Sequence, residues 1–378
     1  MSKIVIVGCG VVGAAIAYEL SLIAGLDITV VEKNTPATGA TGAALGLLMG
    51  VISQKKKGRA WRFRSTSLQR YQTLIPELEA IAGMNITVNR QGIFKLLFAG
   101  ENLEKWHKLA KFRDAAGWKL EIGDRAYVAQ HCPQICSENL LGAVYSPQDR
   151  QINPVELTQA LVTAASHNGV KFHFGIEVKN FITQTQEQLA TCQQLETTRG
   201  KIEVEQLIIA AGLGSTPLTQ ALKQEIPIRP VLGQGIKLKL NQPLGNPDFQ
   251  PAVTGNDIHI IPLDNNQYWL GATLEFTPEI GQLFADAELL NKLQRDAIAF
   301  CPDLKNATIL ATWNGKRPRP EGIPAPIIEK LAGYSNVLLA TAHYRNGVLL
   351  APATALEIVK IVTNNPRLTS SLRRVAND

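Results

Sequence analysis

Apolar runs and periodic apolar stretches divide the chain into alternating strands and helices. Residues 3–7 form a short continuous apolar run, which is typical of a strand buried in a parallel sheet. An alanine-rich stretch with helical spacing follows, and residues 26–31 form a second apolar run that ends at Glu32. A strand, a helix and a second strand in this order predict a βαβ unit at the start of the chain.

The turn between the first strand and the helix carries Gly8, Gly10 and Gly13 in G-x-G-x-x-G spacing. The first glycine allows the tight turn, the second lets backbone approach a pyrophosphate, and the third lets helix and strand pack closely. The N–H groups and dipole of the helix start favour phosphate. Glu32 follows Gly13 by 32 − 13 = 19 residues, where an acid can accept hydrogen bonds from ribose hydroxyls. An acid there disfavours a 2′-phosphate, so the pattern predicts FAD or NAD rather than NADP.

The remaining pattern predicts a chain that leaves the parallel sheet and returns to it. Helices are expected over residues 65–82, 103–116, 154–167 and 287–300, and a last one is expected to open at Pro352. Residues 37–48 are rich in small side chains, which favours a loop and a helix start close to a large ligand. The buried strand 206–211 ends in a second glycine turn at Gly212, which indicates that the parallel sheet resumes there. Period-2 strands between residues 227 and 313 indicate an antiparallel sheet with one face toward a site.

Length and composition indicate a two-domain globular enzyme. The chain has 378 residues, of which 45% are hydrophobic and 19% charged, and no apolar run reaches the roughly 20 residues of a membrane span. The glycine pattern lies inside the apolar N-terminus, so we expect no signal peptide and a cytoplasmic location. Five scattered cysteines fit reduced thiols, and Cys132 and Cys136 have no second pair or nearby His, so no metal site is expected.

The formal net charge is +6, and much of the local excess lies in residues 55–64, KKKGRAWRFR. This run is interpreted as a solvated loop that leads into a helix. The alternative is a contact with an anionic partner, either a membrane surface or RNA. No RNA-binding module or interleaved aromatic stretch accompanies it, so a nucleic-acid partner is not expected.

Taken in this order, the segments resemble the D-amino-acid oxidase family of flavoenzymes, most closely its glycine oxidase branch. The most specific segment is residues 343–354, HYRNGVLLAPAT, and residues 37–48, 149–154, 227–234 and 313–318 support it. The resemblance runs from residue 3 to about residue 362. It implies an α/β (α+β) fold of two domains. A Rossmann-like FAD-binding domain would comprise residues 1–82, 148–226 and 319–378, and a substrate domain with a mixed or antiparallel sheet over the flavin would comprise residues 83–147 and 227–318.

The resemblance also implies which residues hold non-covalent FAD. The pyrophosphate would lie over the glycine turn and helix start, adenosine near Glu32, Lys33 and the backbone of Val178, and the pyrimidine side of the flavin within the C-terminal segment. The full expected set is Gly8, Gly10, Val11, Val12, Gly13, Glu32, Lys33, Ala40, Thr41, Leu45, Gly46, Leu47, Val178, Gly212, His343, Tyr344, Arg345, Asn346, Gly347, Val348 and Leu349. The helix near Pro352 would direct its positive end at the flavin N1 and O2 edge.

For the substrate, the resemblance assigns Arg317, expected at a strand end, to the amino acid carboxylate and Arg345 to the same pocket. His259 stands where the glycine oxidase branch tends to carry Tyr, and Asp257 where it carries His. His259 therefore faces the flavin or has a structural role.

The implied reaction is oxidative deamination of glycine or another small amino acid or amine. Hydride transfer to flavin N5 would give an imine, then a keto acid and ammonia, and dioxygen would give hydrogen peroxide. The product could feed thiazole synthesis for thiamine, and a homo-oligomer is expected. The alternatives are a dehydrogenase that passes electrons to a quinone at the membrane surface and an RNA-modifying flavoprotein. A plain NAD dehydrogenase accounts for the N-terminal pattern but not for residues 343–354.

Overall fold

A six-stranded, mostly parallel sheet forms the centre of one lobe. The computed structural model describes residues 1–186, 188–277 and 283–365, so residues 187, 278–282 and 366–378 of the two expected domains lie outside the described residues. Five strands are parallel, and β20 runs antiparallel to β21. The spatial order is β20 (Ile327–Lys330), β21 (Val337–Thr341), β13 (Gln206–Ile209), β1 (Ser2–Val7), β2 (Leu26–Glu32) and β9 (Lys171–Phe174). The sheet therefore resumes at β13 and β21, as the apolar pattern predicts.

Helices cover one face of this sheet, and a small sheet covers part of the other. The helices are α1 (Val11–Ser21), α2 (Gly58–Ala82), α5 (Pro154–His167) and α8 (Gly347–Thr363). α1 packs on α5 and α8, and α2 packs on the same two helices, in one apolar core. The opposite side carries α6 (Ser215–Ala221) and the antiparallel strands β10 (Val178–Gln186), β11 (Leu189–Thr197) and β12 (Gly200–Glu203).

The second lobe is built on a nine-stranded sheet, antiparallel except for the pair of β5 and β15. Its path is β18 (Glu275–Phe276), β14 (Ile228–Lys239), β17 (Gln267–Gly271), β16 (Ile258–Leu263), β15 (Ala252–Gly255), β5 (Ile93–Phe98), β7 (Leu140–Ser146) and β6 (Glu121–Asp124), and β19 (Thr308–Pro320) pairs with β14. Its helices are α3 (Leu103–Asp114), α4 (Arg125–His131) and α7 (Ala287–Phe300). The 3-10 turns Gly212–Gly214 and Pro302–Asn306 complete the described elements outside the linking sheet.

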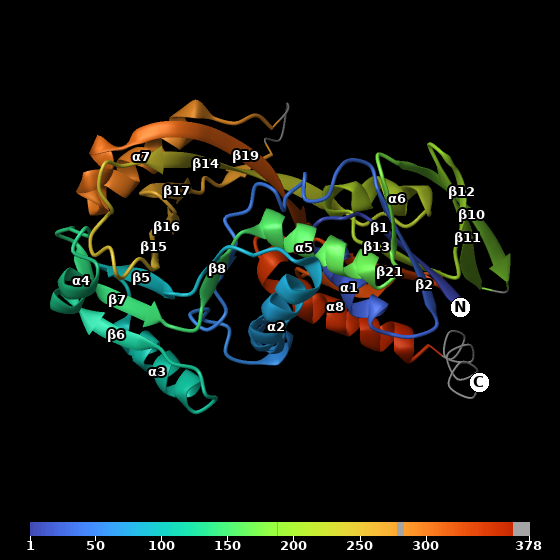
Figure 1. Ribbon diagram of the computed structural model, residues 1–378, viewed down its shortest axis with the longest axis horizontal. Coiled ribbons are helices and arrows are strands. Elements are labelled where there is room, and N and C mark those ends of the chain that lie inside the picture. The colour runs from blue at the N-terminus through green and yellow to red at the C-terminus, as the bar shows by residue number, and fades with distance from the viewer. Residues whose placement is uncertain (187, 278–282, 366–378) are drawn as a thin grey trace.

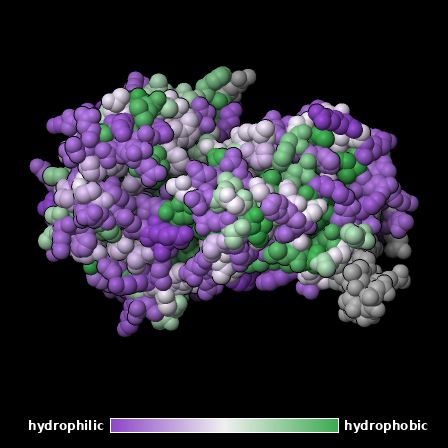
Figure 2. All heavy atoms as spheres, viewed as in Figure 1, coloured by the Kyte–Doolittle hydropathy of each residue, from purple (hydrophilic) through white to green (hydrophobic). Residues whose placement is uncertain are grey.

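Two structural features join the lobes. β3 (Leu47–Leu48), β8 (Arg150–Ile152) and β4 (Val88–Asn89) form a small sheet where the chain passes from one lobe to the other. The paired β14 and β19 extend from the second lobe toward the first (Figure 1). On the face shown in Figure 2 hydrophilic residues predominate, and the outline is indented between the lobes. Within the described ranges, no helix combines the length and apolar character that crossing a bilayer demands.

Four predictions of element boundaries are wrong, and the fourth concerns the last helix. α2 begins at Gly58 rather than at residue 65, because Phe63 continues its apolar stripe into the core. The loop of residues 37–48 continues into β3 and starts no helix. Arg317 is not at a strand end, because β19 pairs with β14 as far as Pro320.

The last helix begins at Gly347, and Pro352 lies inside it. A proline at this position removes the N–H that would bond to the carbonyl four residues earlier. Here that carbonyl, Val348 O, accepts a hydrogen bond from the Tyr71 hydroxyl of α2 at 2.5 Å. The partner on a neighbouring helix therefore lets the helix extend past the proline toward the cavity.

Candidate active site

A single continuous cavity of about 1720 Å³ lies between the two lobes. Its walls combine the carboxyl ends of the parallel strands, the loop of residues 37–55, the inner face of the large sheet and the turn before α8. Cavities for drug-sized ligands usually measure about 300–1,000 Å³, so this one has room for a larger molecule and a small one together. All the expected site residues line it except Gly13.

The glycine turn brings the N-terminus of α1 to the cavity wall. Gly8 has φ +107°, and a Cβ there would lie 2.6 Å from Ala210 O. A Cβ on Gly13 would lie 2.0 Å from Gly8 O, so Gly13 serves the close packing of helix and strand and does not face the cavity. No side chain caps α1 at Gly10, although the Thr41 hydroxyl accepts a hydrogen bond from Val11 N at 3.1 Å. The remaining N–H groups of the first turn are available to an anion.

Glu32 closes one end of the cavity. Its Oε2 accepts a hydrogen bond from Cys9 N at 2.8 Å, and its Oε1 accepts one from Asn34 N at 2.9 Å. These bonds fix the carboxylate at the end of β2 and leave lone pairs free, because a carboxylate can accept about four hydrogen bonds. Burial, with a smaller contribution from the Glu32 charge, raises the pKa of the Cys9 thiol to about 12, so Cys9 is not a nucleophile.

The turn of residues 343–346 forms the other end. Tyr344, with φ +53°, donates from its backbone N to Pro318 O at 3.0 Å, which ties this turn to β19. His343 is buried, and its Nε2 lies 2.8 Å from the Thr354 hydroxyl of α8. Burial and the charge of Arg59 lower the pKa of His343 to about 3, so its ring is neutral. α8 then begins at the cavity without a side-chain cap.

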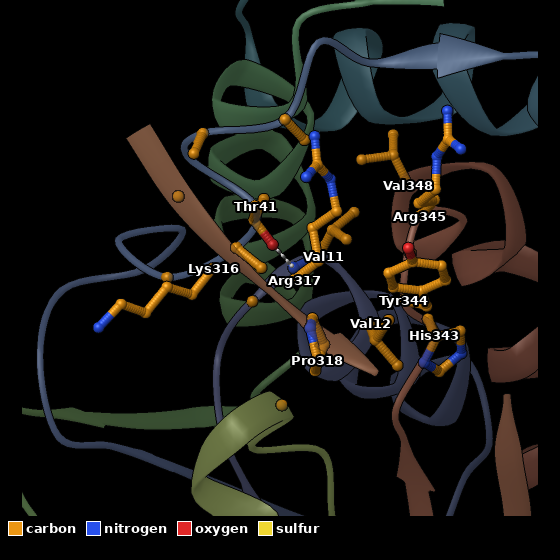
Figure 3. A pocket seen from close by; sticks show the side chains of 18 of the residues that line it. Val11, Val12, Thr41, Lys316, Arg317, Pro318, His343, Tyr344, Arg345 and Val348 are labelled. Atoms are coloured by element: carbon orange, nitrogen blue, oxygen red, sulfur yellow. Dashed lines mark hydrogen bonds between the residues drawn. The ribbon is translucent and has the colours of Figure 1, made fainter. Parts of the chain in front are cut away.

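Arg317 lies in the wall beside this turn. A Cβ on Gly233 would lie 2.2 Å from its guanidinium, so only glycine leaves room for it. Nη1 donates to Leu232 O at 3.0 Å and to Thr273 O at 3.2 Å, whereas Nε and Nη2 have no partner among the described residues. Burial is the largest cause that lowers the pKa of Arg317 below its ordinary value, and the charge of Arg345 adds to it. Figure 3 shows Arg317 and Arg345 extending in the same direction.

Arg345 of the same turn, His259 of β16 and Lys95 of β5 continue the wall. Arg345 Nη2 lies 3.3 Å from Asp257 Oδ1. His259 Nδ1 lies 2.8 Å from the hydroxyl of its cross-strand neighbour Thr254, which in turn is paired with Lys95. Burial first, and the charge of Arg345 second, lower the pKa of His259 to about 4. A neutral imidazole therefore faces the cavity at neutral pH.

Comparison with known proteins gives this cavity its family. The sequence model of the FAD dependent oxidoreductase family (DAO) matches residues 3–361, nearly the whole chain. The chain belongs to this family. FAD is thus the cofactor, the protein is a flavin-dependent oxidoreductase, and the fold is the two-domain fold of that family.

The relatives include single-function and bifunctional proteins. Glycine oxidase of Geobacillus kaustophilus is 28% identical over 360 residues, which cover 95% of this chain and 92% of that protein. The crystal structure of glycine oxidase from that organism superposes with a TM-score of 0.82 and 27% identity, covering 95% of this chain and 94% of the other. The bifunctional protein ThiO/ThiG of Trichormus variabilis is 29% identical over 367 residues, which cover 95% of this chain. The chain spans 52% of the length of that relative.

The residues present fit the cofactor of the family. An acid closes one end of the cavity, an uncapped helix N-terminus lies along it, and a second uncapped N-terminus lies at the far end. Glu32 would hold the ribose, the first turn of α1 the pyrophosphate, and the first turn of α8 the pyrimidine edge. Arg317 and His259 line the same cavity, which would have room for a small substrate beside an FAD.

Sequence reasoning missed five basic residues of the wall, which are Lys55, Arg64, Lys95, Lys179 and Lys316. Lys95 could have been found, because it interrupts the apolar face that Ile93 and Leu97 define on the same strand. Arg64 was hidden in the basic run of residues 55–64, where only the tertiary fold separates the buried cation from its exposed neighbours.

Proposed function

We propose that the chain oxidises the amine of a small amino acid, glycine or a close analogue, and that dioxygen is reduced to hydrogen peroxide. The observation that carries this proposal is Arg317, whose Nε and Nη2 have no partner in the described part of the chain and lie in the cavity wall beside the turn that precedes α8. A planar guanidinium with two adjacent free donors matches a carboxylate. The likeness to glycine oxidases supports a substrate of this class.

The residues of this end would position the substrate and control its protonation. Arg317 would fix the carboxylate and thereby the adjacent Cα–H. The positive charges of Arg317 and Arg345 disfavour an ammonium group nearby, so the amine would be bound neutral and ready for oxidation. Neutral His259 can exchange a hydrogen bond with that amine. FAD, when bound, supplies the acceptor for the hydride of the Cα–H bond and the electrons for dioxygen.

One further proposal rests on the same comparison, and a second rests on the arrangement of the sheets. The likeness to the ThiO/ThiG proteins supports a role in thiamine biosynthesis, in which the imine would be used for thiazole formation. The sheets also support the division of the chain into a FAD-binding unit of residues 1–82, 148–226 and 319–378 and a substrate unit of residues 83–147 and 227–318.

Anaerobic mixing of the FAD-loaded protein with a panel of amino acids tests the proposal. Glycine, sarcosine or D-alanine should bleach the flavin absorbance, and air should then restore it with release of hydrogen peroxide. Absence of bleaching with every amino acid would contradict the proposed reaction. Rapid dye reduction with negligible oxygen uptake would instead identify a dehydrogenase, with a quinone as the candidate acceptor.

A further inference from the structure

The reacting end of the cavity carries more positive charge than one carboxylate can neutralise. Eight basic and three acidic side chains line the cavity in the described part of the chain. Two of the acids, Glu32 and Glu177, lie with Lys33 and Lys179 at the adenosine end, where Lys179 pairs with Glu177. Asp257 is then the one acid among the described lining residues of the other end. The basic residues there are Lys55, Arg64, Lys95, Lys316, Arg317 and Arg345.

Three of these six cations have an acid close by. Arg345 pairs with Asp257 at 3.3 Å, and Lys95 lies 3.8 Å from a Glu101 oxygen. Glu275 acts electrostatically on Arg317. Lys55 is exposed to solvent at the rim. Lys316 extends in a different direction from Arg317 (Figure 3).

Arg64 differs from the others because it is partly buried and has no acidic partner within residues 1–186, 188–277 and 283–365. Its Nη1 donates to Ala60 O at 2.8 Å and its Nη2 to Asn346 Oδ1 at 3.4 Å, whereas its buried Nε has no acceptor. Burial lowers the pKa of this guanidinium below its ordinary value, and no carboxylate of the described residues acts against that effect. A cation held away from water without a counter-charge is costly, and it becomes favourable when an anion binds beside it.

The position of Arg64 places that anion with the substrate rather than with the phosphates of FAD. Asn346, its hydrogen-bond partner, precedes α8 and directly follows Arg345 in the turn after β21, and the strands β13 and β1 separate β21 from β2, which ends at Glu32. The neighbouring sequence strengthens the same field, since residues 33–76 contain eight basic side chains and no Asp or Glu. Each Nη carries two N–H groups and uses one, so donors remain for a ligand.

We propose that Arg64 binds a second anionic group of the substrate, so that the preferred substrate is an amino acid or secondary amine that carries two carboxylates. Arg317 holds the carboxylate next to the reacting carbon, and Arg64 holds the distal one. This inference rests on the proposed amine oxidation. The exposed cations Lys55, Lys57 and Arg59 raise the local concentration of such an anion near the cavity.

The inference can be tested without turnover by titration with carboxylates that cannot be oxidised. Their binding is measured by the change that they cause in the flavin spectrum. The FAD-loaded wild type should bind malonate or succinate about tenfold or more tightly than acetate or propionate, because a charged hydrogen bond contributes roughly 1.5–3 kcal/mol. Arg64→Met should abolish that preference and leave the affinity for acetate within about threefold. Arg64→Lys should retain part of the preference, and Arg62→Met, on the exposed side of the same helix, should retain all of it.

A wild type that binds mono- and dicarboxylates equally would overturn the inference. So would an Arg64→Met variant that keeps the preference or weakens both ligand classes by one factor. The titration requires no oxidation, so its result does not depend on whether any amino acid bleaches the flavin. Absence of bleaching would contradict the proposed amine oxidation, whereas absence of a dicarboxylate preference would contradict the role of Arg64.

Discussion

Arg113 and Asp149 bind the same loop of the cavity wall, residues 50–55. Arg113 binds backbone carbonyl groups of the loop, and Asp149 binds its backbone N–H groups. Arg113 donates from Nε to Val51 O and from Nη2 to Ser53 O and Lys55 O, each at 2.8 Å. Asp149 accepts from the backbone N–H groups of residues 50, 51 and 52 at 2.8–2.9 Å. Both side chains are fully buried, and the Arg113 guanidinium lies 3.5 Å from the centre of the Trp61 ring. Because Ser53 and Lys55 line the cavity, this pair fixes part of its wall.

Removing either member of the pair should destabilise the protein. Asp149→Ala would leave three buried N–H groups without acceptors, and each such loss costs about 1–3 kcal/mol, so we expect a decrease in the free energy of unfolding of roughly 3 kcal/mol or more. Arg113→Met should have an effect of similar size. Denaturant unfolding measures both, with exposed Arg62→Met as the control. Wild-type stability in the Asp149→Ala variant would refute the importance of these bonds.

Arg317 should control substrate use without controlling FAD binding. Arg317→Met removes the two free donors, and we expect kcat/KM for the best amino acid to fall by about 100-fold, as for a lost charged hydrogen-bond pair. Arg317→Lys should recover little, because a single ammonium does not reproduce the planar fork. Steady-state kinetics with the FAD-loaded variants measure this. Arg319→Met is the matched control, since Arg319 is exposed and stacks on Phe276; an equal loss there would argue against a specific role of Arg317.

The sequence predicts those parts of the site that depend on residues close together along the chain. The glycine turn and Glu32 lie within one βαβ unit, and the spacing of these residues reflects the turn and the helix start themselves. Val178 and residues 343–349 were placed by resemblance, and the fold brings them to the same cavity although about 165 residues separate them.

The parts that were missed depend on partners remote in sequence. Pro352 resembles a first helical residue, so the sequence predicts too late a start for α8, whereas the Tyr71 hydroxyl of another helix donates to the carbonyl that the proline leaves without an N–H. The hydrogen bonds that hold residues 50–55 come from Arg113, in a helix, and from Asp149, in a turn. No periodicity in the sequence indicates that a buried arginine will meet three carbonyls of a distant loop. Such contacts follow from tertiary packing alone.

Glu32 should contribute to FAD affinity beyond its structural bonds to Cys9 and Asn34. Glu32→Gln removes the charge and leaves one acceptor oxygen, so we expect the Kd for FAD to rise by about tenfold. Quenching of flavin fluorescence during titration of the apoprotein measures this. Glu177→Gln is the control at the same end of the cavity, because that exposed acid pairs with Lys179. Equal effects of the two changes would contradict a specific contact between Glu32 and the cofactor.

His343 should make the protein less stable in acid. Its pKa is lowered from 6.5 to about 3, so below about pH 6.5 the unfolded chain binds a proton that the folded chain does not. The free energy of unfolding should therefore fall as the pH falls from about 6.5 toward 3, with a slope of up to roughly 1.4 kcal/mol per pH unit from this group. His259, whose pKa is lowered to about 4, adds a slope of the same sign over the upper part of that window.

Replacement of His343 separates its contribution from that of the carboxylates, which also titrate at low pH. His343→Asn keeps a polar side chain beside Thr354 and removes the proton-binding group. Chemical denaturation of the wild type and the variant should be compared at a series of pH values between about 7.5 and 4.5. The stability advantage of the wild type over the variant should shrink steadily below about pH 6.5, because only the wild type loses free energy through this group. A difference that stays constant across the series would mean that His343 titrates alike in the folded and unfolded chains, in conflict with its burial against α8.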